Sequence, residues 1–187
     1  MHALSVDPSG RYLTYSEELR SGPAGSRGRS TTRTVTVDVR DGRSVVSSLP
    51  DGSRHYSKDG RTVLVLSEND PRGVGSPTSY SARLFDVSRP LSPVPLTPNV
   101  VIADRYVITG ALSEDGSRIA LQSGSGAAQV MTVSIRDRAL RERATWKTTA
   151  HELFFAGRYL VVGGQRGQRL LDWTTDEISI YDCSLLP

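Results

Sequence analysis

The sequence predicts an all-β fold, a β-propeller built of about four antiparallel blades with four strands each. Three observations lead to this prediction. A short hairpin pattern recurs four times along the 187 residues, two further strand patterns follow each hairpin, and no stretch has convincing helical periodicity. Seventeen glycines and ten prolines also favour short strands and turns. Four strands in each unit of roughly 40 to 56 residues is typical of a propeller blade.

Each hairpin joins two short strands through a polar turn that ends in glycine. The hairpin segments are residues 3–16, 55–67, 111–123 and 152–163. The turn glycines are Gly10, Gly60, Gly116 and Gly157, spaced 50, 56 and 41 residues apart. Glycine suits the last position of such a turn, which often needs a positive φ. The neighbouring Asp59 or Asp115 can accept hydrogen bonds from its own backbone, and we expect the same of Asp7 despite an apparent Pro-Ser insertion.

Two more strands complete each predicted blade. The third strands are expected at residues 34–39, 81–87, 129–135 and 169–173, and the closing strands at 44–49, 94–97, 141–146 and 178–181. Three of the third strands carry an aspartate at or next to their end, Asp38, Asp86 and Asp172, which we expect to cap adjacent backbone. The chain is then a single propeller domain or a propeller fragment, with units at about 1–49, 50–104, 105–149 and 150–187.

Four blades are few for a closed ring. A blade is apolar on both faces and needs a neighbour on each side. Three arrangements therefore stay open: a four-bladed ring, part of a larger propeller, and a partial ring completed by a second copy. We favour the last two.

The repeated unit resembles known propeller families. Its turn, Asp59-Gly-Arg61, is followed by alternating apolar residues, as in WD-repeat and TolB-like propellers. The segment Arg83-Leu-Phe-Asp-Val87 is similar to the third strand of a WD repeat with Phe in place of Trp. The Gly-His dipeptide of WD repeats is absent, so their hydrogen-bond network does not carry over. TolB-like propellers are the nearer resemblance.

Composition excludes several classes of protein. No stretch approaches 18 apolar residues, and the N-terminus has no basic and apolar regions typical of a signal peptide, so we expect a cytoplasmic protein without membrane insertion. Cys183 is the only cysteine and is expected to be a buried small apolar residue. The net charge is only +3, and 21 of the 23 basic residues are arginines spread along the chain, which argues against nucleic-acid binding.

The sequence shows no catalytic, metal or cofactor pattern. There is no Gly-x-Ser-x-Gly elbow, and no pair of His or Cys residues has the spacing of metal ligands. His55 and His151 precede or begin hairpins and are expected to be blade-edge residues. We therefore predict no catalytic residue, no metal ligand and no cofactor.

The predicted function is that of a non-catalytic scaffold, which binds a protein or peptide through the loops at one end of the propeller. The alternative is the propeller part of an enzyme, either a peptidase or a hydrolase with a metal in its channel. A third hypothesis is nucleic-acid binding through arginine-bearing loops. The residues of those possible binding loops are Arg27, Arg29, Arg33, Arg136 and Arg138.

Overall fold

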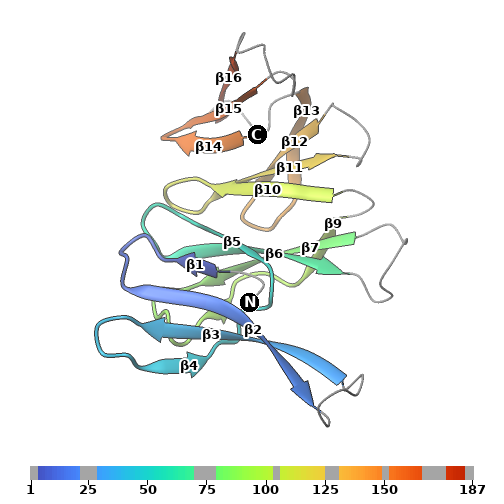
Figure 1. The fold of residues 1–187 in the computed structure, drawn as a ribbon. Helices are drawn as coiled ribbons and strands as arrows, with labels where there is room; N and C mark the ends of the chain where they lie inside the picture. Colours follow the sequence, from blue (N-terminus) through green and yellow to red (C-terminus); the bar gives the residue numbers. More distant parts are fainter. Residues whose placement is uncertain are drawn as a thin grey trace.

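A computed structural model describes residues 4–21, 29–69, 79–102, 106–124, 131–148, 152–165 and 176–183. Its described residues form four antiparallel sheets, each made from one continuous part of the chain (Figure 1). This arrangement confirms the predicted fold class. Within the described ranges no helix is long and apolar enough to cross a membrane.

The first sheet has the strand order β1-β2-β3-β4. Its strands are β1 (Leu4–Val6), β2 (Tyr12–Ser21), β3 (Arg29–Asp38) and β4 (Ser44–Val46). The third sheet has the same order, β10-β11-β12-β13. Its strands are β10 (Tyr106–Leu112), β11 (Arg118–Gly124), β12 (Met131–Asp137) and β13 (Glu142–Thr148). These strands place β-branched and aromatic residues on a pleated surface, where their side chains pack well.

The second sheet has an interrupted outer strand. Its strands are β5 (Ser53–Tyr56), β6 (Thr62–Asn69), β7 (Ser79–Asp86), β8 (Val94–Pro95) and β9 (Val100–Ile102), of which both β8 and β9 pair with β7. The expected closing strand at 94–97 is thus only two residues long. Pro95 and Pro98 lack the N–H group that a regular ladder requires. Between the two short strands, the Thr97 hydroxyl accepts the Leu84 N–H at 3.0 Å.

The fourth sheet corrects the sequence analysis. Its described strands are β14 (Glu152–Ala156), β15 (Tyr159–Gln165) and β16 (Asp176–Asp182), in that order. Residues 178–181 were expected to close the blade as its fourth strand. They belong instead to β16, which pairs directly with β15 and is the third strand. The expected third strand at 169–173 lies outside the described residues.

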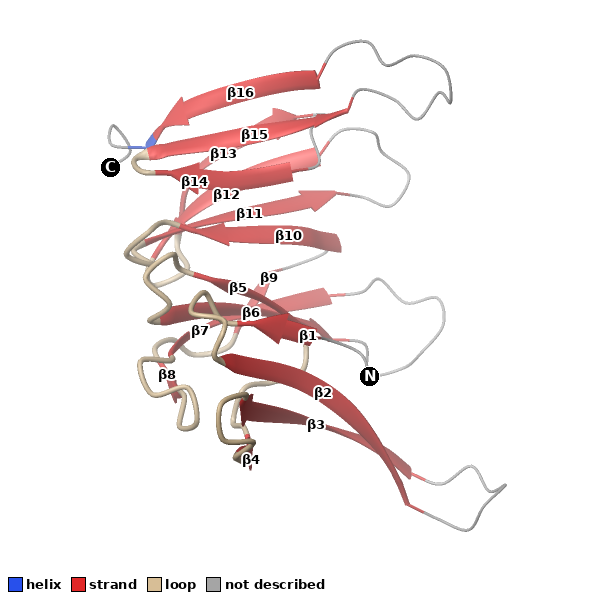
Figure 2. Ribbon diagram, turned by 60° about the vertical axis from the view of Figure 1, so that its left-hand side comes forward, coloured by secondary structure: helices blue, strands red, loops and turns tan. Residues whose placement is uncertain are grey.

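The four sheets follow one another in chain order along an arc, with the first and fourth at opposite ends (Figures 1 and 2). Apolar side chains fill the spaces between the second, third and fourth sheets. One cluster, including Leu64, Leu84 and Leu121, joins the second and third sheets. Another, including Val133 and Leu160, joins the third and fourth. A third cluster covers the face of the second sheet that is turned towards the first.

Within each sheet, the connections between successive paired strands lie alternately at one end of the sheet and at the other. The β1–β2, β5–β6, β10–β11 and β14–β15 turns lie at one end, together with the β3–β4 and β12–β13 turns (Figure 2). The turn glycines Gly10, Gly60, Gly116 and Gly157 have φ angles of 70°, 70°, 67° and 60°. Only glycine adopts this left-handed conformation without a steric cost.

Alanine substitutions at Gly10 and Gly116 distinguish two causes of lost stability. One is the strain of a positive φ angle, and the other is a steric clash between neighbouring sheets. A Cβ at Gly10 would meet nothing within 4 Å, whereas a Cβ at Gly116 would lie 2.8 Å from Thr62 of the second sheet. We expect Gly10→Ala to lower the free energy of unfolding by about 1 kcal/mol, through φ strain alone. Gly116→Ala should cost about 2–3 kcal/mol because overpacking adds to this strain. Urea unfolding measures both, and equal losses would contradict the sheet contact.

Candidate functional site

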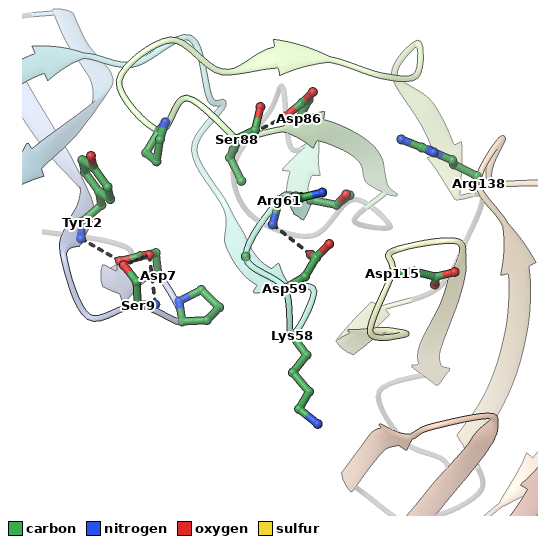
Figure 3. A pocket seen from close by; sticks show the side chains of 15 residues that line it. Asp7, Ser9, Tyr12, Lys58, Asp59, Arg61, Asp86, Ser88, Asp115 and Arg138 are labelled. Carbon is green, nitrogen blue, oxygen red and sulfur yellow. Dashed lines mark hydrogen bonds between the residues drawn. The ribbon is translucent and has the colours of Figure 1, made fainter.

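A cleft of about 1010 Å³ lies where the turns of the first three sheets meet (Figure 3). We call it the turn cleft. It is lined by the β1–β2 and β5–β6 turns, by the chain around the end of β7, and by residues of the two turns of the third sheet. Its charged residues are Asp7, Asp59, Asp86, Asp115, Lys58, Arg61 and Arg138.

The β5–β6 turn is built on the sequence Ser57-Lys-Asp-Gly60. The Ser57 hydroxyl donates to the Asp59 carboxylate at 2.6 Å and accepts the Thr62 N–H at 3.0 Å. The Asp59 carboxylate also accepts the Arg61 N–H at 3.0 Å. The serine and the aspartate together therefore satisfy the backbone donors that follow the glycine.

The β10–β11 turn repeats this arrangement with Ser113 and Asp115. The Ser113 hydroxyl donates to Asp115 at 2.8 Å and accepts the Arg118 N–H at 2.9 Å, and Asp115 accepts the Ser117 N–H at 3.0 Å. The bond from the Ser117 backbone is the largest of the effects that hold the pKa of Asp115 below its ordinary value. The serine before each aspartate, which sequence analysis passed over, is part of the repeated turn.

The β1–β2 turn contains the same two residue types in exchanged places. Its sequence is Asp7-Pro-Ser-Gly10, which has the same length as the other turns, so the apparent insertion before the glycine does not exist. Asp7 stands where the other turns have serine and accepts the Tyr12 N–H at 2.6 Å. Ser9 stands where they have aspartate, and its hydroxyl donates to Asp7 at 2.5 Å. Partial burial raises the pKa of Asp7, but these hydrogen bonds outweigh it and lower the pKa overall.

A second repeated feature links the residue after each turn glycine to the end of the third strand. Four aspartates occupy the same register position there, Asp38, Asp86, Asp137 and Asp182. Asp182 is therefore the equivalent residue of the fourth sheet, whereas Asp172, predicted for this role, lies outside the described residues. An arginine follows the turn glycine in three of the four sheets, as Arg11, Arg61 and Arg158.

In the first and fourth sheets this arginine and this aspartate form an ion pair. Arg11 donates from Nε at 2.8 Å and from Nη2 at 2.5 Å to the buried Asp38 carboxylate. Arg158 lies 3.3 Å from Asp182. Each arginine also stacks over the tyrosine that follows it, at 5.1 Å for Tyr12 and 4.9 Å for Tyr159.

The second sheet lacks this ion pair. The Asp86 carboxylate accepts the Ser88 N–H at 2.8 Å, just as Asp38 accepts the Arg40 N–H at 3.0 Å, and the Ser88 bond is the largest cause of the lowered pKa of Asp86. Arg61 and Arg138 lie close enough to lower that pKa further. Neither guanidinium has a hydrogen-bond or ion-pair partner within the described part of the chain. The turn cleft therefore has two unpaired guanidinium groups near Asp86, whereas its other carboxylates, Asp7, Asp59 and Asp115, accept hydrogen bonds from their own turns.

The other basic residue of the cleft is already paired. Lys58 reaches across to the turn of the third sheet, where its ammonium lies 2.5 Å from the Glu114 carboxylate. The hydrogen bond to Glu114 raises the pKa of Lys58. Lys58 thus connects two sheets, which leaves Arg61 and Arg138 as the groups best suited to bind an anionic ligand.

The remaining predicted binding residues are not brought to the cleft. Arg33 pairs with Glu17 on the neighbouring strand β2. Arg136 donates to the Leu140 carbonyl at 2.9 Å and to Glu142 at 3.2 Å. Arg27 and the side chain of Arg29 lie outside the described residues. Gly157 forms the turn of the fourth sheet, which does not line the cleft.

Sequence analysis singled out Arg138 but missed Arg61. The signal was present as the dipeptide Gly-Arg, which recurs as Gly10-Arg11, Gly60-Arg61 and Gly157-Arg158. What the sequence could not show is that Arg61, unlike Arg11 and Arg158, forms no ion pair with the aspartate at the end of the third strand of its own sheet.

The described residues contain no group of three or more His, Cys, Asp or Glu that could hold a metal ion. His55 lies on β5, and its Nε2 is buried without a hydrogen-bond partner. Burial lowers the pKa of His55, which favours a neutral ring. Cys183 is buried too, and burial raises the pKa of its thiol, so the reactive thiolate is disfavoured.

No family model matches the sequence, and no curated protein matches it. Among solved structures, the chain is similar to the β-propeller domain of the Trilobed protease from Pyrococcus furiosus. The TM-score is 0.59 at 11% identity, over 92% of this chain and 51% of that one. The fold is a β-propeller.

Two further propeller neighbours are peptidases. Acylaminoacyl peptidase from Pyrococcus horikoshii matches with a TM-score of 0.59 at 11% identity, over 91% of this chain and 29% of that one. A prolyl endopeptidase matches with a TM-score of 0.54 at 12% identity, over 86% and 24%. The chain thus spans between a quarter and a half of the length of these neighbours. They support the propeller fold, without specific support for the TolB-like or WD-repeat families.

The Arg11–Asp38 pair predicts a pH-dependent stability. Its hydrogen bond lowers the pKa of Asp38 from its ordinary value of 3.8, so the carboxylate stabilises the fold above pH 3.8 and stops doing so as the pH falls below it. We expect Asp38→Asn to lower the free energy of unfolding at pH 7, and this effect to shrink progressively as the pH falls below 3.8 towards the lowered pKa of Asp38. Urea unfolding across this range, with Asp41→Asn as the exposed control, measures it. A loss that is constant with pH would contradict the ion pair.

Proposed function

We propose that this chain is the propeller part of a peptidase, in which it receives peptide for a catalytic domain that lies outside the 187 residues. The similarity to propeller domains of several peptidases is the observation that carries the proposal. The similarity itself is one of fold. The chemistry of the turn cleft supports the step from fold to peptide.

The turn cleft has the properties of a peptide-binding surface. Its volume of about 1010 Å³ is that of a large ligand site, and it extends over turns of three sheets. Arg61 and Arg138 present guanidinium groups, which bind carboxylates through paired hydrogen bonds. A peptide's terminal carboxylate, or an acidic side chain, would satisfy both arginines near Asp86.

The described residues support a binding role more than a catalytic one. The aspartates of the three turns accept hydrogen bonds from their own turns, as described above, which lowers their capacity to act as bases. Within the described part of the chain, Nε2 of the half-buried His55 has no hydrogen-bond partner, and no carboxylate is among the causes of its pKa shift. Nucleophilic catalysis needs a base next to the nucleophile and a third group that orients this base, and His55 lacks such an orienting group among the described residues.

A second candidate function is a non-catalytic scaffold that binds a folded protein partner. The observation that favours it is the breadth of the turn cleft, which is formed by hydrogen-bonded turns of three sheets. The two functions predict different activities for the complex that contains this chain. A peptidase part is associated with hydrolytic activity, and a scaffold is not.

Capture of the native protein tests the proposal. Antibodies against this chain, applied to extracts of the source cells, should bring down an activity that cleaves fluorogenic peptides. The purified 187-residue chain should show none. Recombinant chain added to the extract as competitor is the control, since it should displace the activity from the antibody. Captured protein without peptidase activity would overturn the proposal in favour of the scaffold.

The role of the two arginines is tested separately by peptide binding. A fluorescent peptide with a free terminal carboxylate should bind the purified chain more tightly than its amidated form, by fluorescence anisotropy. We expect Arg61→Ala or Arg138→Ala to weaken binding of the carboxylate form by about 5- to 20-fold, the worth of a charge-assisted hydrogen bond. Arg43→Ala, an exposed arginine away from the cleft, is the matched control. Equal binding of the two peptide forms would contradict carboxylate recognition.

A further inference from the structure

The face of the first sheet that packs against the second sheet is polar. Thr14, Ser16, Thr34 and Thr36 are buried there, and the Thr14 and Thr36 hydroxyls are 3.1 Å apart. Arg54 of β5 donates to the Ser16 and Thr34 hydroxyls at 3.1 and 3.3 Å. These contacts fix which face of the first sheet is turned towards its neighbour.

The opposite face of the first sheet carries exposed apolar side chains on its outer strands, and Val35 at its centre is only 6% exposed. Because side chains alternate along a strand, Leu4, Tyr15, Val35 and Val46 form one cross-strand row on this face. Leu4 is 61% exposed and Val46 is 65% exposed. A second row contains Val6, Leu13 and Val37, of which Val6 is also exposed. We call this surface the first end face.

The fourth sheet has the corresponding surface at the other end of the arc. Leu153, Leu160 and Val162 point inwards and pack against the third sheet. The alternate residues point away from it, and Phe154, Val161 and Ile180 form a cross-strand row there. Phe154 is 54% exposed and Ile180 is 65% exposed. We call this surface the second end face.

We infer that the two end faces bind each other between two copies of this chain, so that two arcs close into one ring. Both faces carry aliphatic or aromatic rows, as do the faces that join the second, third and fourth sheets. Their contact would continue the sheet-on-sheet packing already present inside the chain. This inference does not depend on the proposed peptidase function.

The length of the chain favours a second copy as the occupant. The chain covers 51% of the propeller domain of the Trilobed protease, so two copies supply the length of one such domain. A two-fold axis through the centre of the ring places the first end face of each copy against the second end face of the other. The two contacts are then identical, and the assembly closes at two copies without growing into a filament.

Light scattering behind a sizing column measures the assembly directly. Across a concentration series the purified chain should reach twice its mass of 20.3 kDa. Val46→Asp on the first end face and Phe154→Asp on the second should each shift the chain towards 20.3 kDa, because each change places a charge in both contacts of the ring. Val101→Asp, at a residue 59% exposed on β9, is the matched control and should remain a dimer.

A mixture of the two variants distinguishes a ring from other contacts. Val46→Asp keeps an intact second end face, and Phe154→Asp keeps an intact first end face, so the two together retain one good contact. We expect a mixed dimer, captured by a tag on one variant, where each variant alone is monomeric. The mixture also shows that both variants are folded.

Three results would overturn the inference. The first is a wild-type chain that stays monomeric at every concentration, which would leave the end faces to a different occupant. The second is a dimer that survives both substitutions. The third is a dimer lost in only one variant, which would show that two like faces meet. Peptidase activity captured from cells would be unaffected by any of these, so the two proposals fail independently.

Discussion

The structure depends on one constraint: a sheet with apolar side chains on both faces must be covered from both sides. The second and third sheets meet it fully, since neighbouring sheets lie on either side of each. Val63, Leu64, Leu84 and Leu121 are at most 1% exposed as a result. Close approach also requires Gly110 on β10, where a Cβ would lie 2.9 Å from Leu64. The constraint is unmet only at the two ends of the described arc.

The same repetition that builds the core also explains the turn cleft. In the first and fourth sheets, an arginine after the turn neutralises an aspartate at the end of the third strand. In the second sheet Arg61 forms no such pair with Asp86, and it lines the turn cleft together with Arg138. An arginine that forms a structural ion pair in two repeats therefore lines the cleft in a third repeat.

Much of the fold could be predicted because its determinants are local. Glycine at the end of a tight turn and alternating apolar residues act within a few positions, so the hairpins and the strands after them could be located. The fourth sheet was harder, since only pairing with β15 shows that residues 178–181 form the third strand. The exchange of Asp7 and Ser9 was hidden too, because either side chain can accept the backbone hydrogen bond that the turn needs.

The candidate site was less predictable than the fold, for a physical reason. Its lining comes from turns roughly 50 residues apart in sequence, which approach only because the sheets pack side by side. Arg138 was found from local charge density, whereas the availability of Arg61 depends on the absence of an ion pair with Asp86, which lies at the end of another strand. The arginines Arg33 and Arg136 look equivalent in sequence, yet acidic neighbours neutralise both. Charge in the sequence therefore overstates the charge that is free to bind.

The two sides of the first sheet differ in a way that links stability to ring closure. Its contact with the second sheet contains buried hydroxyls and Arg54, whose pKa is lowered by burial, and such groups gain little net free energy on leaving water. The apolar residues of this sheet, which could gain more, lie on the opposite face. Covering the first end face would therefore add apolar burial to a sheet whose contact with its own neighbour is partly polar. A partner at the open end would act on the stability of the first sheet as well as on the assembly.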